Sequence, residues 1–389
     1  MQLLQAYLDT KRHRLFDSKL KVFDASIWLH AFSRSTIAIF IPILMLQLGY
    51  SIRAVIGYYF LYYLLDIPLT FFAGWLTRRI GARAVLIIGS FFSVAFFAVL
   101  YNLSANDFVL LGLLALFAAL YDSLYWVSHL YLFMVFSKND KNISRDASIL
   151  AIMRHVAGIL APAFGAIILI FFNQKLLILI STSILIVSIL PLFVVRSLKD
   201  KPPAVKLKRI KFFNQRHVSR DYISNGLFSV HRAAENVIWP IFIFLLFANI
   251  KSVASLPIII SVTAMVFTYF IGGVAKAGRQ RLILIGSLAI TGVWLARLAI
   301  EGPMFFYISV FLVGLFSIMI TIPVDSNIFE KGEKRDALSA SVYRNASSII
   351  GRFILYSVLL LLVNVFQVSF SAAALGVFLL LLLNVSIFK

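Results

Sequence analysis

The sequence predicts an all-α polytopic membrane protein whose twelve transmembrane helices form two pseudo-symmetric six-helix bundles. Composition is the first indication, because 61% of the residues are apolar and 13% are charged, whereas about a quarter of a soluble domain is charged. The second is that the apolar residues form continuous runs of about 20, the length that a membrane-spanning helix needs. These runs do not alternate as barrel strands would. Helices are therefore the expected way of pairing the backbone in lipid.

Twelve apolar segments are long enough to span a bilayer. Their predicted cores are 23–48, 54–77, 84–101, 108–136, 147–172, 175–195, 222–248, 253–275, 282–300, 304–329, 337–363 and 368–388. The predicted organisation is an N-terminal arm (1–22), a first bundle (23–195), a central loop (196–220) and a second bundle (221–389). The central loop is rich in Lys and Arg and holds Pro202-Pro203, a composition that stays solvated rather than packing.

An internal repeat of about half the chain length is the third observation. The run from Gly81 to Phe91 returns from Gly278 to Leu288 with both glycines, an isoleucine and the serine in place, at an offset of 197 residues. Such a repeat indicates two copies of one helical unit.

Two arginine positions repeat as well. Arg34 and Arg232 each lie eight residues before a proline, Pro42 or Pro240. Later in each half, an Arg-Asp-Ala sequence is followed after nine residues by a second arginine, and these second arginines are Arg154 and Arg344.

The net charge of +20 reflects membrane insertion rather than nucleic-acid binding. Most Lys and Arg lie in the N-terminal arm, the even-numbered loops and the C-terminus, which is the positive-inside pattern. We expect both termini and the central loop to be cytoplasmic, the protein to be multi-pass in the cell membrane, and anionic headgroups to be lipid partners. The basic N-terminal arm is too polar for a cleaved signal peptide. No cysteine is present, which excludes disulfides and thiolate chemistry.

The loop between the second and third segments resembles a known signature. Gly74-x-Leu76-x-Arg78-Arg79-x-Gly81-Ala82-Arg83 is similar to G-x-L-x-D-R-x-G-R-R of the major facilitator superfamily, and Gly158 to Gly165 is similar to a loose form of its helix 5 motif. The resemblance implies alternating access of two six-helix bundles around a central site. Its gating residues would correspond to Gly74, Arg78, Arg79, Gly81 and Arg83, and we add Asp325 near the cytoplasmic end.

This chain departs from the signature at two positions. Arg78 replaces the acidic residue, and Ala82 replaces the first of the paired arginines. In the family that acid helps to lock the cytoplasmic side, so a lock of that kind is not expected here. Arg352 would then need another partner.

Charged side chains inside the membrane are the candidate functional groups, because each costs about 3 kcal/mol or more at mid-bilayer. At about 1.5 Å per residue, five of them lie roughly 13 to 18 Å from the cytoplasmic end. These five are Arg34, Asp66, Arg154, Arg232 and Arg344, and Asp122 and Glu235 lie a little deeper. They form a belt near the midplane.

The leading hypothesis is a small organic anion as substrate, because guanidinium groups bind carboxylate and phosphate oxygens in bidentate fashion. The expected substrate-binding residues are Arg34, Arg232, His30, His231, Arg154, Arg344, Tyr125 and Trp126. The paired arginines resemble the arrangement in glycerol-3-phosphate/phosphate antiporters of the superfamily. The alternative reading is that these arginines form salt bridges that hold helices together, for example Arg232 with Glu235.

Four further residues are candidates for proton coupling: Asp66, Asp122, Glu235 and His129. Burial favours protonated carboxyl groups, although the acids would serve equally well as counter-ions to the arginines. Asp122, Tyr125, Trp126 and His129 have helical spacing and share one face. That aromatic face is typical of packing as well as of a substrate wall.

Three classes of function remain open. The first is a symporter or antiporter of an organic anion, proton-coupled or exchanging with a counter-substrate. The second is a drug-type or sugar-type permease for a neutral or cationic solute, which the aromatic face favours. The third is an intramembrane enzyme, but neither H-E-x-x-H, G-x-S-x-G nor a phosphate-binding G-x-x-x-x-G-K-[ST] occurs. We therefore expect no enzyme activity, no cofactor, no metal site and a monomer.

Overall fold

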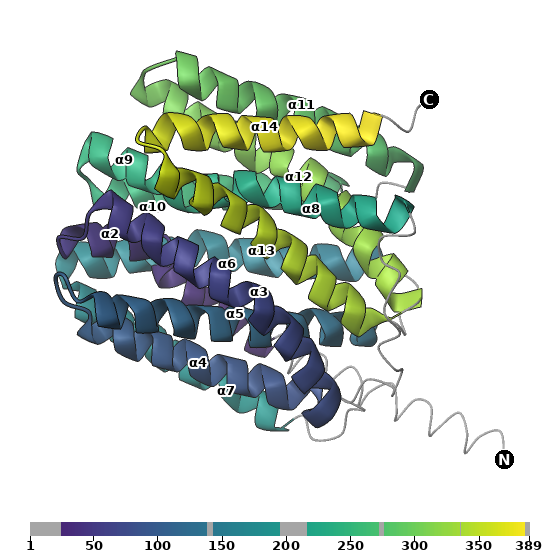
Figure 1. Ribbon diagram of the computed structural model, residues 1–389, viewed down its shortest axis with the longest axis horizontal. Coiled ribbons are helices and arrows are strands. Elements are labelled where there is room, and N and C mark those ends of the chain that lie inside the picture. Colours follow the sequence, from purple (N-terminus) through teal and green to yellow (C-terminus); the bar gives the residue numbers. More distant parts are fainter. Residues whose placement is uncertain (1–24, 138–142, 195–215, 272–275, 335, 386–389) are drawn as a thin grey trace.

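The computed structural model describes residues 25–137, 143–194, 216–271, 276–334 and 336–385, and these residues form helices without a strand (Figure 1). Ten helical segments among them are long and apolar enough to cross a membrane by length and composition. The two remaining predicted spans are also helices. One is α6 (Ile143–Phe171), whose described apolar part is Val156–Phe171, and the other is α13 (Ala337–Leu361), which carries Arg344 and Arg352.

Each of the twelve predicted segments corresponds to one helical rod. The first half contains a rod over 25–47 that ends in α2 (Ile41–Gln47), then α3 (Ile52–Ile80), α4 (Ala82–Asn102), α5 (Phe108–Ser137), α6 and α7 (Gln174–Val194). The second half contains α8 (Arg216–Ala233), η2 (Ala234–Ile238), α9 (Trp239–Phe247), α10 (Ile250–Ile271), α11 (Lys276–Ala299), α12 (Pro303–Lys334), α13 and α14 (Val365–Val385). Helix α8 begins inside the segment that the sequence assigns to the central loop. The N-terminal arm and residues 196–215 lie outside the described residues.

The two halves pack through equivalent helix pairs. Helix α3 of the first half lies along α13 of the second, and α6 lies along α10 (Figure 1). In the repeat, α3 is equivalent to α10 and α13 is equivalent to α6. The two helix pairs are therefore symmetry-related copies of the same contact. Small residues and stacked rings form it: the rings of Tyr59 and Tyr356 lie 5.2 Å apart, and a Cβ atom on Gly74 would lie 2.6 Å from Val342.

Contacts between the halves occur at both ends of the helices. At one end α2 contacts α9. At the other end, the buried rings of Phe133 on α5 and Phe329 on α12 lie 5.4 Å apart. The described parts of the two halves are therefore in contact at both ends of the helices.

The repeated prolines produce an interruption in the same rod of each half. Before Pro42 the helix is broken by a turn at 38–40, and before Pro240 it widens into the π-helix η2. A proline lacks the backbone N–H and clashes with the carbonyl four residues earlier. A turn or a π segment relieves that clash. Arg34 and Arg232 thus both lie just before a break.

The repeated glycines also have one structural role. A Cβ atom on Gly89 would lie 2.7 Å from Tyr125 N on α5, and one on Gly286 would lie 2.9 Å from Phe316 O on α12. These glycines allow α4 to approach α5 and α11 to approach α12. The repeat read from the sequence therefore preserves a close contact between neighbouring helices in both halves.

Replacing Gly351 with alanine should destabilise the protein by about 1 to 3 kcal/mol. The added Cβ atom would lie 2.0 Å from the carbonyl oxygen of Gly226, where α13 crosses α8, and backbone cannot yield as a side chain can. Thermal unfolding of the purified protein in detergent should show the loss. Gly292→Ala is the matched control, because nothing lies within 4 Å of its Cβ position. It should be neutral or stabilising by roughly 1 kcal/mol, and equal behaviour of the two variants would contradict this prediction.

Candidate functional site

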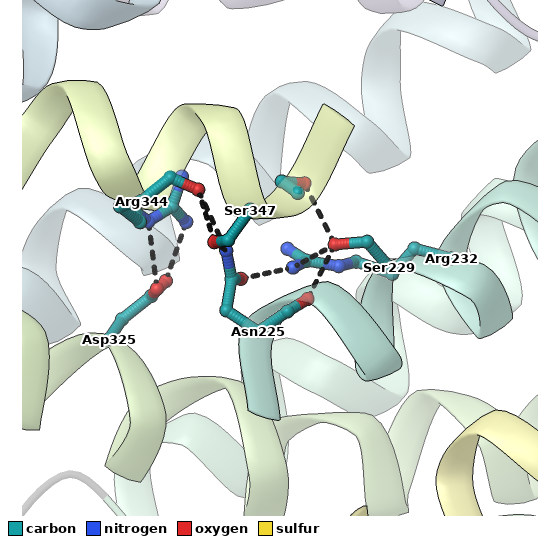
Figure 2. Close-up of polar contacts among 7 residues, drawn as sticks. Asn225, Ser229, Arg232, Asp325, Arg344 and Ser347 are labelled. Atoms are coloured by element: carbon teal, nitrogen blue, oxygen red, sulfur yellow. Dashed lines mark hydrogen bonds and ion pairs between the residues drawn. The ribbon is translucent and has the colours of Figure 1, made fainter. Parts of the chain in front are cut away.

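Two arginines of the second half lie near each other, Arg232 in the last turn of α8 and Arg344 in the first third of α13. Arg344 makes a bidentate ion pair with Asp325 of α12, with Nε to Oδ1 and Nη2 to Oδ2 both at 2.9 Å (Figure 2). Planar two-bond pairs of this kind fix both partners in orientation. The Arg344 guanidinium is therefore held by an acid of its own half.

Arg232 is held differently, by neutral groups. Its Nη2 donates to Asn225 Oδ1 at 2.6 Å and to Ser229 Oγ at 3.0 Å (Figure 2). Its buried Nε has no hydrogen-bond partner within the described residues. The ion pairs between described residues leave Arg232 without a carboxylate. It also lies within electrostatic range of Arg344, Arg352 and Asp325, and Asp325 is already paired with Arg344.

Asn225 joins the two helices that carry these arginines. Its Nδ2 donates to Arg344 O at 2.8 Å and to Ser347 Oγ at 2.9 Å (Figure 2). Asn225, Ser229 and Arg232 lie at i, i+4 and i+7, which places them on one face of α8. Sequence reasoning missed Asn225, Ser229 and Ser347, although that spacing before Arg232 was a usable signal.

Arg34 of the first half lies among aromatic rings. Its Cζ is 4.5 Å from the ring centroid of Tyr121, 5.1 Å from Phe96 and 5.5 Å from Phe97. Its buried Nη1 has no hydrogen-bond partner in the described part of the chain. Like Arg232, it takes part in none of the ion pairs between described residues. Ring faces attract a guanidinium but do not neutralise its charge.

An aromatic face on α5 continues from this arginine. His30 hydrogen-bonds to the Tyr121 hydroxyl at 2.8 Å and stacks on Tyr125, with ring centroids 3.9 Å apart. Tyr125 in turn stacks on His129 at 5.5 Å, and Trp126 contacts both rings. The predicted face with Tyr125, Trp126 and His129 is thus contiguous.

His231 lies apart from its neighbour Arg232. Its Nδ1 accepts a hydrogen bond of 2.8 Å from Trp294 Nε1, and its Nε2 lies 3.2 Å from Ser317 Oγ. Both ring nitrogens are therefore engaged inside the second half. The side chain of Arg154 lies outside the described residues.

Glu235 forms a buried ion pair with Arg297 of α11 rather than with Arg232. The two oxygens of Glu235 lie 2.5 and 3.2 Å from the Arg297 Nη atoms. The Arg297 guanidinium lies over Trp239 at 3.7 Å and over Trp294 at 4.5 Å. The pair fastens the π segment η2 to α11.

Arg78, one of the residues expected to gate, lies where the end of α3 meets the start of α13. Arg78 pairs with Asp336 of the other half, Nη2 to Oδ2 at 3.2 Å. Asp336 also caps α13, accepting from the backbone N–H groups of Leu338 and Ser339. The position that is acidic in the family signature is thus basic here, and its partner on the opposite half is acidic.

The other signature residues act locally. Arg83 donates to the carbonyl oxygens of Leu192 at 2.7 Å and Phe193 at 3.1 Å, which ties α4 to the end of α7 within one half. Arg79 lies over the Trp75 ring. Gly81 has φ +96°, a conformation that favours glycine, so it allows the turn between α3 and α4.

Comparisons with known proteins agree with this architecture. The Major Facilitator Superfamily family model matches residues 24–250. A crystal structure of the human organic anion transporter MFSD10 (TETRAN) superposes with a TM-score of 0.65 at 12% identity, covering 95% of this chain and 99% of that one. A mutant of the peptide transporter POT, in complex with sulfate, gives 0.64 at 15% identity, covering 95% and 94%. At such identities the likeness concerns the fold. A search of curated proteins found no match.

Proposed function

We propose, because the chain belongs to the major facilitator superfamily, that it is a secondary active transporter of a small organic anion that works by alternating access. The anion would be moved together with protons or in exchange for a counter-substrate. Arg34 and Arg232 would bind it, one from each half, with Arg344 and Arg154 adding positive charge. His30, Tyr125 and Trp126 would line its path on the first half.

The observation that carries this proposal is the charge balance at Arg34 and Arg232. They occupy equivalent positions before equivalent prolines, and neither shares an ion pair with a described carboxylate. An uncompensated guanidinium within a membrane span is costly. An anionic substrate would supply the missing charge from between the halves. His231 has no place in this site, since its ring nitrogens serve Trp294 and Ser317.

The fold is compatible with this substrate class, since a structure on which the chain superposes is that of an organic anion transporter. A second candidate is a drug-type or sugar-type permease for a neutral or cationic solute, which the contiguous rings of Tyr125, Trp126 and His129 favour. We further propose that the end bearing Arg78 and Asp336 faces the cytoplasm, because the basic loops predict that orientation. There the Arg78–Asp336 pair would gate together with Gly74, Gly81 and Asp325.

A substrate screen should separate the two candidates. Purified protein in proteoliposomes is tested with succinate, glycerol 3-phosphate, glucose and tetraphenylphosphonium, by uptake and by thermal stabilisation. We expect uptake of at least one anion and stabilisation by it, because a ligand that binds only the folded protein stabilises it by mass action. Transport confined to glucose or tetraphenylphosphonium would favour the permease instead. Liposomes without protein measure leakage.

A further inference from the structure

A pair of buried carboxyl groups lies where α3 and α5 meet α13 of the other half. Asp66 is 0% exposed and Asp122 is 7% exposed, and the two carboxyl groups lie within hydrogen-bonding reach of each other. Asp66 Oδ1 accepts a hydrogen bond from Ser123. Asp66 Oδ2 receives none from any donor in the described residues. Two ionised carboxylates can only accept hydrogen bonds. A hydrogen bond between Asp66 and Asp122 therefore requires a proton on one of them.

The charges around Asp66 and Asp122 also indicate that the two carboxyl groups hold one proton. Arg352 of α13 interacts electrostatically with both acids, and its Cζ lies 5.6 Å from the Tyr63 ring. Tyr62 and Tyr63, both phenols, lie in electrostatic range of the two acids. Arg232 lies in range of Arg352, whereas the described side chains that act most strongly on Asp66 are Asp122, Ser123 and Arg352. Two ionised carboxylates facing one guanidinium would leave a net negative charge inside the membrane, which is costly. One bound proton makes the group neutral and supplies the missing hydrogen.

The second half contacts the acid pair through Asn345 and Arg352, which lie on one face of α13. Asn345 Nδ2 donates to Thr70 Oγ1 at 3.2 Å, Thr70 lies 3.3 Å from Ser123 Oγ, and Ser123 donates to Asp66. Arg352 follows Asn345 by seven residues, so both lie on the same face of α13. Separation of α13 from α3 would remove the counter-ion and break this chain of hydrogen bonds together.

We propose that Asp66 and Asp122 share one transported proton, and that Arg352 and Asn345 couple its presence to the contact between the halves. This inference rests on the proposed transport function and specifies its coupling ion. With one proton bound, the pair and Arg352 are neutral and the contact is closed. A second proton leaves Arg352 unbalanced and weakens the contact. When the halves part, the carboxyl groups meet water and exchange their proton.

Infrared spectroscopy of the purified protein in nanodiscs tests the shared proton without any substrate. We expect a C=O stretch of a buried protonated carboxyl group at about pH 7, and its loss in both Asp66→Asn and Asp122→Asn, where one carboxylate balances Arg352. In Arg352→Gln neutrality requires two protons, so the band should grow about twofold. Asp107→Asn is the control, since Asp107 caps α5 in a loop and Asn caps equally well. Absence of the band in the wild type, or its survival in both Asn variants, would overturn the proposal.

Distances between spin labels test whether protonation of the acid pair changes the contact between the two halves. The chain has no cysteine, so Trp75→Cys on α3 and Lys334→Cys on α12 place one label on each half. We expect a longer distance at about pH 5 than at about pH 8. The double variant Asp66→Asn/Asp122→Asn should give the longer distance at both values, because Arg352 is then unbalanced throughout. A pH-independent distance in the wild type would overturn the coupling, whereas failure of every anion in the transport screen would overturn only the proposed substrate.

Discussion

Replacing Glu235 with alanine should lower the free energy of unfolding by about 3 to 5 kcal/mol, the largest stability effect that we expect of any single charge in this protein. The side chain of its partner Arg297 is 0% exposed and lies against Trp239 and Trp294. Without Glu235 the guanidinium keeps its charge and loses its carboxylate. The fold must then hold a lone cation between two indole rings or move α11.

Unfolding in mixed micelles by titration with SDS, followed by circular dichroism, measures this loss. The double variant Glu235→Ala/Arg297→Met removes both charges and should recover most of the stability, because a buried ion pair can be replaced by apolar groups at little cost. Glu330→Ala is the comparison variant, since its pair with Arg279 is partly exposed and should be worth about 1 kcal/mol or less. A double variant no more stable than Glu235→Ala would show that the loss arises elsewhere.

The helices themselves could be predicted from the sequence because hydropathy and length decide them. The predicted segment 108–136 is α5 over Phe108–Ser137, and 84–101 is α4 over Ala82–Asn102. The repeat added tertiary information, since Pro42 and Pro240 mark equivalent breaks. It could not show that one break is a turn and the other a π segment. That choice depends on what packs around each break, and Glu235 in the π segment is anchored to Arg297.

Partners of the buried charges could not be predicted in this way. Spacing along a helix suggests Arg232 as the partner of Glu235, whereas the structure pairs Glu235 with Arg297, 62 residues later. Local spacing gives the neighbours on one helix, but burial inside a bundle is decided by which other helix faces that residue. Arg352 illustrates the same limit. The altered loop signature indicated only that it needs another partner, and α13 places it beside Asp66 and Asp122.

Neutralising either repeated arginine should lower anion transport at least about tenfold, because a hydrogen bond to a charged group is worth about 1.5 to 3 kcal/mol and about 1.4 kcal/mol is a factor of ten. The variants are Arg34→Gln and Arg232→Gln, measured by initial uptake of the anion identified in the screen. Arg→Lys at the same positions keeps the charge but not the planar fork, so intermediate rates are expected. Arg53→Gln is the matched control, because Arg53 is an exposed arginine at the start of α3.

Asp325→Asn should raise the affinity for the anion, whereas the arginine variants should weaken its transport. Asp325 is the carboxylate that occupies the Arg344 guanidinium, so an anionic substrate near Arg232 competes with it for the same positive charge. Removing that competitor should lower the concentration of anion at half-maximal uptake by about tenfold, equivalent to about 1.4 kcal/mol, and slow its release. Transport at the wild-type rate in Arg34→Gln and Arg232→Gln, together with an unchanged affinity in Asp325→Asn, would mean that these arginines serve the fold and that the anion binds elsewhere. An effect confined to one arginine of the pair would contradict the prediction for the other and show that the two halves contribute unequally.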